Sequence, residues 1–393
     1  MFGTHHSKMM ILLRHDETAQ VVIHTANMIV RDWTNMTQAV WLSPRLPLMK
    51  PSQQSPSDEG AKIGSGAKFK IDFLNYLRAY DVRFPTCKPI IDQLVKYDFS
   101  AVKGSLIASV PGRHKLHDNS SQTKWGWAAM AQALKAVPLT PTTQSTITVQ
   151  ISSIATLGPT DAWLQNTFFR ALAGGRRDNT TNTTLQQRKP PSFKVIFPTA
   201  DEIRRSLDGY ASGGSIHTKT QSPQQAKQLQ YLTPLFCHWA NDSPNGAELS
   251  KDDDSPTTRK DGGRNRAAPH IKTYIRYNNN SRLSEASIDW ALVTSANLSK
   301  QAWGDAVNSA GEVRVSSYEI GVLVWPGLYA EGAVMKGAFL ADELADGEGG
   351  KAAVALRVPY SLPLQAYGRG EVPWVATARH LEPDWMGRAW QHD

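Results

Sequence analysis

The stretch Phe2-Gly-Thr-His-His-Ser-Lys-Met-Met10, with Val22-Ile-His-Thr-Ala-Asn27 after it, has a counterpart in the second half of the chain. There Pro269-His-Ile-Lys-Thr-Tyr274 is followed by Val293-Thr-Ser-Ala-Asn-Leu298. Each copy reads His-x-Lys and then an apolar segment that ends in Ala-Asn. A repeat of this kind predicts two similar structural units that meet at one site.

The chemistry of the repeat points to a phosphoryl group. Residues two apart on a strand point to the same side, so we expect His6 and Lys8 to project together, and likewise His270 and Lys272. A histidine can act as nucleophile or general acid near neutral pH, whereas lysine and asparagine donate hydrogen bonds to phosphoryl oxygens. Two copies face to face would place one imidazole on each side of a phosphorus. In-line displacement would then be possible with no metal ion, because the lysines supply positive charge.

Short apolar runs alternate with amphipathic segments along the rest of the chain. The runs predict strands over 9–13, 21–25, 147–151, 193–197, 291–294 and 321–324. The amphipathic segments predict helices over 70–80, 90–97, 161–172 and 225–239. Strands interleaved with helices indicate a layered α/β architecture.

Three polar segments, 50–68, 176–191 and 241–268, interrupt this pattern. Such compositions bury too little apolar surface to offset the entropy lost on ordering, so we expect surface loops or insertions. The chain then divides into an N-terminal domain over 1–112 and a C-terminal domain over 113–393, with insertions at about 176–191 and 241–268.

Composition narrows the class of protein. The 393 residues are 40% hydrophobic and 20% charged, which excludes a wholly disordered chain. No apolar run approaches the ~20 residues of a membrane-spanning helix. Only Cys87 and Cys237 occur, which excludes a disulfide framework and favours a cytosolic or nuclear setting. The net charge of +8 suits a polyanion, either nucleic acid or an anionic membrane.

The paired His-x-Lys motifs resemble the phospholipase D superfamily, and the segments quoted above resemble the tyrosyl-DNA phosphodiesterase family nearly residue for residue. Ser317-Tyr-Glu-Ile-Gly-Val-Leu323 extends this resemblance, which covers most of the chain outside the polar segments. Most phospholipase D relatives carry an Asp five residues after the lysine. Those positions are Leu13 and Tyr277 here, and lacking the Asp is characteristic of the tyrosyl-DNA group.

The resemblance implies an α/β fold of two similar phospholipase D-like α-β-α sandwich domains related by a pseudo-two-fold axis. Relatives carry a long folded stretch before the first motif, so we expect the first domain to be truncated at its N-terminus. A domain without its central strands exposes backbone and apolar faces. We therefore expect this chain alone to be poorly stable and a longer form to carry the activity.

The resemblance also implies roles for individual residues. His6 would attack a DNA 3′-phosphate and form a covalent phosphohistidine, while His270 would act as general acid and then as general base. Glu319 and Gln38 would orient the two histidines. The residues implied to hold the phosphoryl oxygens are Lys8, Lys272, Asn27 and Asn297. No cofactor and no metal ion are implied.

The substrate implied is a DNA 3′ end, single-stranded or nicked, that carries a topoisomerase-derived tyrosyl peptide or another 3′ adduct. Phe2 matches an aromatic residue that stacks on a base, and Ala155-Thr156 stands where the family has Gly-Ser. The residues implied to contact DNA are Phe2, Gly3, Ser152, Ser153, Thr156, Ser299 and Lys300. We expect a nuclear DNA-repair enzyme of exonuclease type, a monomer, with no membrane partner.

Two other functions stay open at this point. The missing front of the first domain allows a catalytically inactive, DNA-binding fragment. A phospholipase D-type lipid phosphodiesterase is the third reading, against which stand the missing Asp positions and the lack of a basic amphipathic membrane helix.

Overall fold

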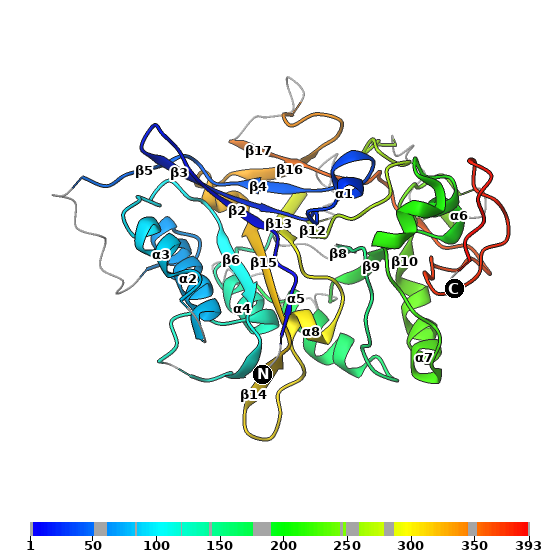
Figure 1. Ribbon diagram of the computed structural model, residues 1–393, viewed down its shortest axis with the longest axis horizontal. Coiled ribbons are helices and arrows are strands. Elements are labelled where there is room, and N and C mark those ends of the chain that lie inside the picture. The colour runs from blue at the N-terminus through cyan, green and yellow to red at the C-terminus, as the bar shows by residue number, and fades with distance from the viewer. Residues whose placement is uncertain are drawn as a thin grey trace, which may run out of the picture.

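The computed structural model describes residues 3–50, 61–82, 85–118, 120–140, 144–175, 190–243, 247–248, 259–278, 287–344 and 352–391. Within these ranges the chain forms a mixed α/β structure built on one large sheet (Figure 1). Its twelve strands are β1 (Thr4–His5), β6 (Ser105–Ser109), β8 (Ser145–Gln150), β9 (Ser192–Ile196), β10 (Phe236–Cys237), β11 (Ala247–Glu248), β12 (Thr273–Asn278), β13 (Ser287–Thr294), β15 (Ser317–Val324), β16 (Val334–Ala338), β17 (Ala353–Arg357) and β18 (Gln365–Ala366).

The order along the sheet is β1-β15-β13-β12-β8-β9-β10-β18-β11, with β6 also paired to β15 and β16–β17 attached to β13. A second sheet contains β2 (Met9–Leu13), β3 (Thr18–His24), β4 (Val40–Leu42) and β5 (Leu46–Pro47). A separate two-stranded ribbon pairs β7 (Gly112–Lys115) with β14 (Glu312–Val315). All six predicted strands are confirmed, with ends that differ by a few residues.

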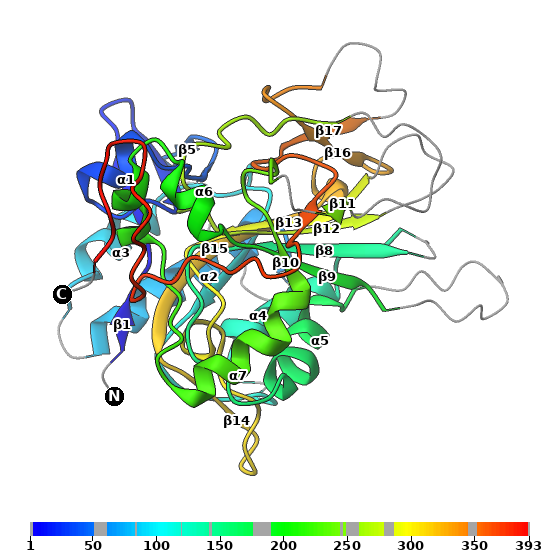
Figure 2. The same ribbon diagram turned by 90° about the vertical axis from the view of Figure 1, so that its right-hand side faces the viewer.

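The helices are short and cover the sheets. They are α1 (Val30–Thr34), α2 (Gly66–Arg78), α3 (Lys88–Leu94), α4 (Gly126–Leu134), α5 (Arg170–Leu172), α6 (Ala200–Arg204), α7 (Pro223–Leu232) and α8 (Lys300–Trp303). A π-helical turn over Leu164–Phe169 leads directly into α5. Figure 2 shows α4, α5 and α7 on one side of the large sheet and β16 and β17 on the other.

Side chains that alternate between the two faces of the central strands fill a buried layer on each side of the large sheet. On β12, Tyr274 packs with α5 and α8 residues, whereas the next residue, Ile275, packs toward β16. This follows from the period of two in a strand, which sends successive side chains to opposite faces. A third cluster joins α2 and α3 to β3, β6 and β15. Strand β15 therefore contributes to the core beside the first His-x-Lys and also to the large sheet.

Two sequence predictions about elements need correction. The helix predicted over 225–239 ends at Leu232, because Pro234 removes a backbone donor and Phe236–Cys237 instead pairs in parallel with β9. The loop predicted over 50–68 contains the start of α2, which Ser65 caps by accepting a hydrogen bond from the Lys68 amide. Residues 51–60, 176–189, 244–246 and 249–258 of the predicted polar segments lie outside the described residues.

The predicted boundary at residue 112 stays a prediction. Strands from both sides of it share the large sheet, since β1 and β6 pair with β15.

A buried ion pair in the large sheet allows a test of its stability. Arg276 on β12 has its Nε 3.2 Å from Asp289 Oδ2 on β13, with exposed fractions of 8% and 1%. We expect Arg276→Met to lower the free energy of unfolding by about 3–5 kcal/mol, because it leaves a buried carboxylate without its partner. Urea unfolding measures this. The double variant Arg276→Met/Asp289→Asn should recover most of the loss, since the oxygen of the new amide can still accept the hydrogen bond of the Thr140 amide; a double variant as unstable as the single one contradicts the explanation.

Candidate active site

The two His-x-Lys triplets occupy equivalent places in two similar hairpins. Each triplet lies directly before a strand, β2 or β12, rather than within the strand as the sequence predicted. Lys8 Nζ donates to the His6 carbonyl at 2.6 Å, and Lys272 Nζ donates to the His270 carbonyl at 2.7 Å. The lysine carbonyls also match, since each accepts an amide from the end of the neighbouring strand: His24 N at 3.0 Å and Thr294 N at 3.2 Å. The repeat seen in sequence is therefore a repeat of backbone geometry.

Each histidine is anchored by a segment from the other half of the chain. The His6 amide donates to the Tyr318 carbonyl, and the His270 amide donates to the Thr37 carbonyl, both at 3.1 Å. The residue after Tyr318 is Glu319, and the residue after Thr37 is Gln38. Glu319 and Gln38 thus hold corresponding positions in the backbone pattern. The site forms only when both halves of the chain come together.

Glu319 fixes the ring of His6. Its Oε2 lies 2.9 Å from His6 Nδ1 and also accepts a hydrogen bond from the Ser295 hydroxyl at 2.6 Å. A carboxylate at Nδ1 selects the tautomer that carries the proton there, which leaves the lone pair on Nε2. The His6 side chain is 29% exposed and Glu319 is 5% exposed. His6 is therefore partly accessible, whereas the carboxylate that orients it is buried.

The carboxylate beside His270 belongs to Asp32, not to Gln38. Asp32 Oδ2 lies 3.1 Å from His270 Nδ1. It also accepts a hydrogen bond from the backbone N–H of Asn27 at 2.7 Å. Gln38 instead accepts a hydrogen bond from the Thr25 hydroxyl and donates to the Asp32 carbonyl. The sequence analysis thus assigned to Gln38 a contact that Asp32 makes, because α1 folds a carboxylate between the two.

The other ring nitrogen of His270, Nε2, has two hydrogen-bond donors beside it. Lys272 Nζ lies 3.3 Å from it and Asn27 Nδ2 lies 3.4 Å from it. His270 and Lys272 are 3% and 0% exposed. Asn27, from the first copy, therefore reaches the histidine of the second, and the two halves share one set of donors.

Burial lowers the pKa of the cationic groups of this cluster, and repulsion between these groups adds to the effect. Burial lowers the pKa of Lys8 to about 8, although Glu319 and Asp32 act to raise it. The pKa of His270 is well below its usual value, first because of burial and then because of Lys272, Lys8 and His6. Burial likewise holds the pKa of Lys272 well below its usual range. Cations that repel one another in a buried site are stabilised by an anion, so this cluster is suited to a phosphoryl group.

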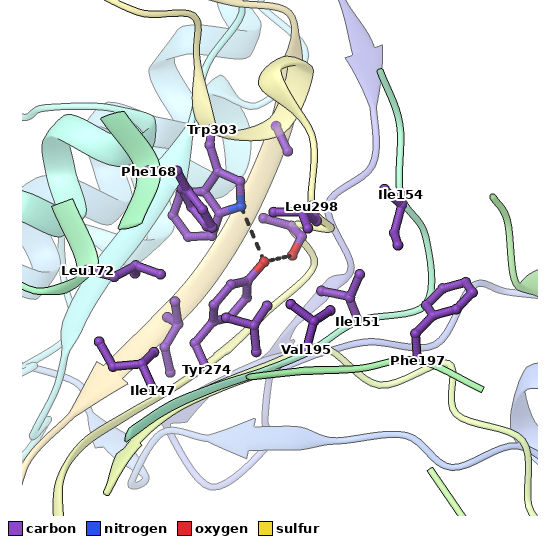
Figure 3. Packing of buried hydrophobic residues seen from close by; sticks show 14 of the residues in the cluster. Ile147, Ile151, Ile154, Phe168, Leu172, Val195, Phe197, Tyr274, Leu298 and Trp303 are labelled. Carbon is purple, nitrogen blue, oxygen red and sulfur yellow. Dashed lines mark hydrogen bonds between the residues drawn. The ribbon is translucent and has the colours of Figure 1, made fainter. Parts of the chain in front are cut away.

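The side-chain oxygen of Asn297 is bonded to a neighbouring loop, at Ser152 and Ser153. Its Oδ1 accepts hydrogen bonds from the backbone N–H groups of Ser152 and Ser153 at 3.1 and 3.0 Å. These bonds connect the loop over residues 152–158, called the serine loop below, to the second Ala-Asn. The core holds the same turn from its buried side: the Tyr274 hydroxyl donates to the Ala296 carbonyl, and the Trp303 indole donates to the Tyr274 hydroxyl (Figure 3). The Trp303 indole also lies within hydrogen-bonding distance of the Asn297 carbonyl, at 3.0 Å. The turn is thereby held on two sides.

The other residues predicted to contact DNA lie around this turn. Ser153 pairs with His217 of the neighbouring segment, and Thr156 is exposed one residue before Leu157. The Ser299 hydroxyl caps α8 by accepting the Ala302 amide, so part of its hydrogen-bonding capacity is already used. Gly3 is exposed beside Pro111, and Phe2 lies outside the described residues. Lys300 Nζ lies close above Gly158, at the end of the serine loop.

Sequence reasoning missed Asp32 and Ser295. The signal for Asp32 was a carboxylate five residues after Asn27, in an otherwise apolar and exposed segment. Ser295 was already inside the quoted motif, but only the fold shows that its hydroxyl supports Glu319.

The described residues contain no group of three or more His, Cys, Asp or Glu arranged to hold a metal ion. Among the same residues, no helix has the length and apolar character needed to cross a bilayer.

Comparison with known proteins gives one family throughout. A family model described as tyrosyl-DNA phosphodiesterase matches residues 1–368. The chain is similar to a probable tyrosyl-DNA phosphodiesterase of Schizosaccharomyces pombe, with 29% identity over 99% of this chain and 78% of the relative. It is 32% identical to tyrosyl-DNA phosphodiesterase 1 of Drosophila melanogaster, over 95% of this chain but only 57% of that protein.

The fold is similar to that of a solved relative. A crystal structure of the yeast tyrosyl-DNA phosphodiesterase matches 94% of this chain and 77% of its own length, with a TM-score of 0.62 and 19% identity.

The pKa of Lys8 predicts how anion binding depends on pH. With a pKa of about 8, Lys8 is charged at neutral pH and loses its proton as the pH rises through that value. We expect the affinity for sulfate, whose charge does not change in this range, to fall about tenfold between about pH 7 and pH 9. Lys8→Arg should move this loss to higher pH, because a guanidinium stays protonated. Isothermal titration calorimetry measures both, and an unchanged pH profile in Lys8→Arg contradicts the assignment.

Proposed function

We propose that this chain, which belongs to the tyrosyl-DNA phosphodiesterase family, hydrolyses phosphodiester bonds between a DNA 3′ end and a tyrosyl peptide or another adduct. The observation that carries the proposal is the pair of imidazoles, each with Nδ1 against a carboxylate from the other half of the chain. Burial first, and then the charges of Lys272 and Lys8, lower the pKa of His270. Family membership supports a DNA-repair phosphoric diester hydrolase over the other two readings.

In the first step His6 Nε2 attacks the phosphorus. The bond from phosphorus to the tyrosyl oxygen breaks, and this oxygen takes a proton from His270 Nε2. Lys8, Lys272 and Asn27 donate to the non-bridging oxygens, where negative charge develops. Binding of the phosphoryl anion offsets the repulsion from Lys272, Lys8 and His6 that lowers the pKa of His270. The anion therefore favours the protonated ring that a general acid requires.

In the second step the neutral His270 takes a proton from water as its oxygen attacks the phosphorus. The bond from phosphorus to His6 Nε2 breaks, and the products are a DNA 3′-phosphate and the free enzyme. Splitting one displacement into two through a covalent intermediate is the usual gain of nucleophilic catalysis. Asp32 holds His270 in position for both of its roles.

The same proposal includes the residues that contact the DNA strand, the form of the DNA end, the oligomeric state and the location in the cell. Asn297, Ser153, Thr156, Ser299 and Lys300 would follow the strand behind the scissile phosphate. The side chain of Ser152 is 1% exposed, so its contribution would come through the loop it shares with Ser153. We propose a single-stranded or nicked 3′ end as substrate, a monomeric enzyme and a nuclear location.

A 3′-phosphotyrosyl oligonucleotide tests the reaction directly. We expect cleavage to a 3′-phosphate in the presence of EDTA, and His6→Ala should reduce kcat by at least about a thousandfold because the nucleophile is lost. Denaturing gel electrophoresis separates substrate from product. His15→Ala is the matched control, since His15 is an exposed histidine in the turn of the same hairpin. Binding without cleavage by the wild-type chain points to an inactive DNA-binding fragment, and cleavage of phosphatidylcholine alone points to a lipid enzyme.

Removing the second histidine should separate the two steps. We expect His270→Ala to accumulate a covalent DNA–protein adduct, because the base that activates water is gone while His6 can still attack. Asp32→Asn should show a weaker form of the same effect, with kcat lowered about 10–100-fold. The adduct is measured as a shifted protein band that carries the labelled DNA. Asp16→Asn, an exposed turn carboxylate, is the control, and a fast, adduct-free His270→Ala enzyme rules out the assigned role.

A further inference from the structure

The β7–β14 ribbon carries an unusual pair of like charges. In its antiparallel register Arg113 lies directly opposite Arg314, and Lys115 lies opposite Glu312. Residues directly opposite one another point to the same face of a ribbon, where like charges destabilise the pairing. Arg113, Lys115 and Arg314 are exposed, and Arg113 Nη1 is 3.8 Å from Glu312 Oε2. One carboxylate thus faces three cations.

The opposite face of the ribbon is fixed to the body of the protein. Val313 and Val315 are 2% and 0% exposed and pack near Gly304 at the end of α8. The Asp305 amide donates to the Arg314 carbonyl at 2.9 Å. Strand β14 lies at the lower edge of the molecule in both views, below the strands of the large sheet (Figures 1 and 2). Its cations are therefore held on a rigid support.

A cavity of about 340 Å³ lies between the ribbon and the start of α4. Its charged lining consists of Arg113, Lys115, Lys124, Asp118 and Glu312, and Trp125 forms an aromatic wall. Lys124 Nζ donates to the Asp118 carbonyl at 2.6 Å, whereas the Asp118 carboxylate accepts from the Ser120 hydroxyl and amide.

The cavity also has a histidine in its lining. His114 lines the cavity beside Trp125, and burial lowers the pKa of its imidazole. With Arg314, the ribbon and cavity together present four cationic side chains against two carboxylates. Cations beside an aromatic wall are the two elements of single-stranded nucleic-acid binding.

The ribbon is joined to the active site through both of its strands. β14 continues through Ser316 into β15, which carries Glu319, and β7 follows β6, whose Ser109 is the register partner of Glu319. Arg314 and Glu319 are five positions apart in the chain, so at ~3.3 Å per residue their Cα atoms are at most about 17 Å apart. At ~3.4 Å per nucleotide, about five stacked nucleotides would cover that distance.

We propose that the ribbon and its cavity bind the substrate strand about five nucleotides from the cleaved 3′ end. A phosphate would lie between Arg113 and Arg314, where it relieves their repulsion, and a base would lie against Trp125. The inference rests on the proposed function, because it assigns a second contact to the same DNA strand.

The test compares substrates of two lengths. Arg113→Gln/Arg314→Gln is assayed against 3′-phosphotyrosyl oligonucleotides of three and fifteen nucleotides. The short one is the internal reference, because three stacked nucleotides at ~3.4 Å each are shorter than the proposed five-nucleotide path to the ribbon. We expect kcat/KM for the long substrate to fall about tenfold relative to the short one. In fluorescence anisotropy with the fifteen-nucleotide DNA, the slope of log K against log salt should become shallower by about 1.4, since two phosphate contacts are lost.

A charge-matched control separates the ribbon from the general charge of the protein. Lys88→Gln/Lys96→Gln removes two exposed lysines on and after α3. It should leave the ratio between the two substrates as in the wild type. Equal losses on both lengths, or no loss in the ribbon variant while the wild type cleaves both, would overturn the ribbon site. A wild-type chain that binds DNA through Arg113 and Arg314 but cleaves neither substrate would retain the ribbon site and contradict the proposed function.

Discussion

Two buried carboxylates, Glu319 and Asp32, allow two imidazoles and two ammonium groups to share one small space. The cost of this arrangement is visible in the lowered pKa values of Lys8, His270 and Lys272, all of them caused first by burial. Both carboxylates act to raise the pKa of Lys8 and of Lys272. Glu319 also sets the tautomer of the His6 ring, and Asp32 lies 3.1 Å from Nδ1 of His270. The negative charge of a phosphoryl group would stabilise the protonated forms of these groups. The charged groups of the site are therefore already arranged to bind such an anion.

The carboxylates are exchanged between the halves of the chain. His6 of the first copy is held by Glu319 of the second, and His270 of the second is held by Asp32 of the first. The backbone repeats the exchange through the carbonyls of Tyr318 and Thr37. Neither half has a complete set of contacts alone. The association of the halves and the assembly of the site are therefore a single structural event.

The two copies are not identical where they meet the substrate. Asn27 reaches His270, whereas the oxygen of Asn297 is committed to the amides of the serine loop. The second copy is also supported by a buried tyrosine and tryptophan under its turn. The two Ala-Asn turns therefore differ in use: the first brings a donor to His270, and the second anchors the loop at Ser152 and Ser153.

The sequence alone determined the repeat, the residue types of the site and the strands that carry it, because strand periodicity and the His-x-Lys spacing are local properties. It could not determine that Asp32 rather than Gln38 meets His270, since that depends on how α1 folds over the neighbouring half. The end of the helix predicted over 225–239 was likewise decided by pairing of Phe236–Cys237 with β9. The opposition of Arg113 and Arg314, which are far apart in the sequence, exists only in the register of two strands, because electrostatic contact follows distance in space and not along the chain.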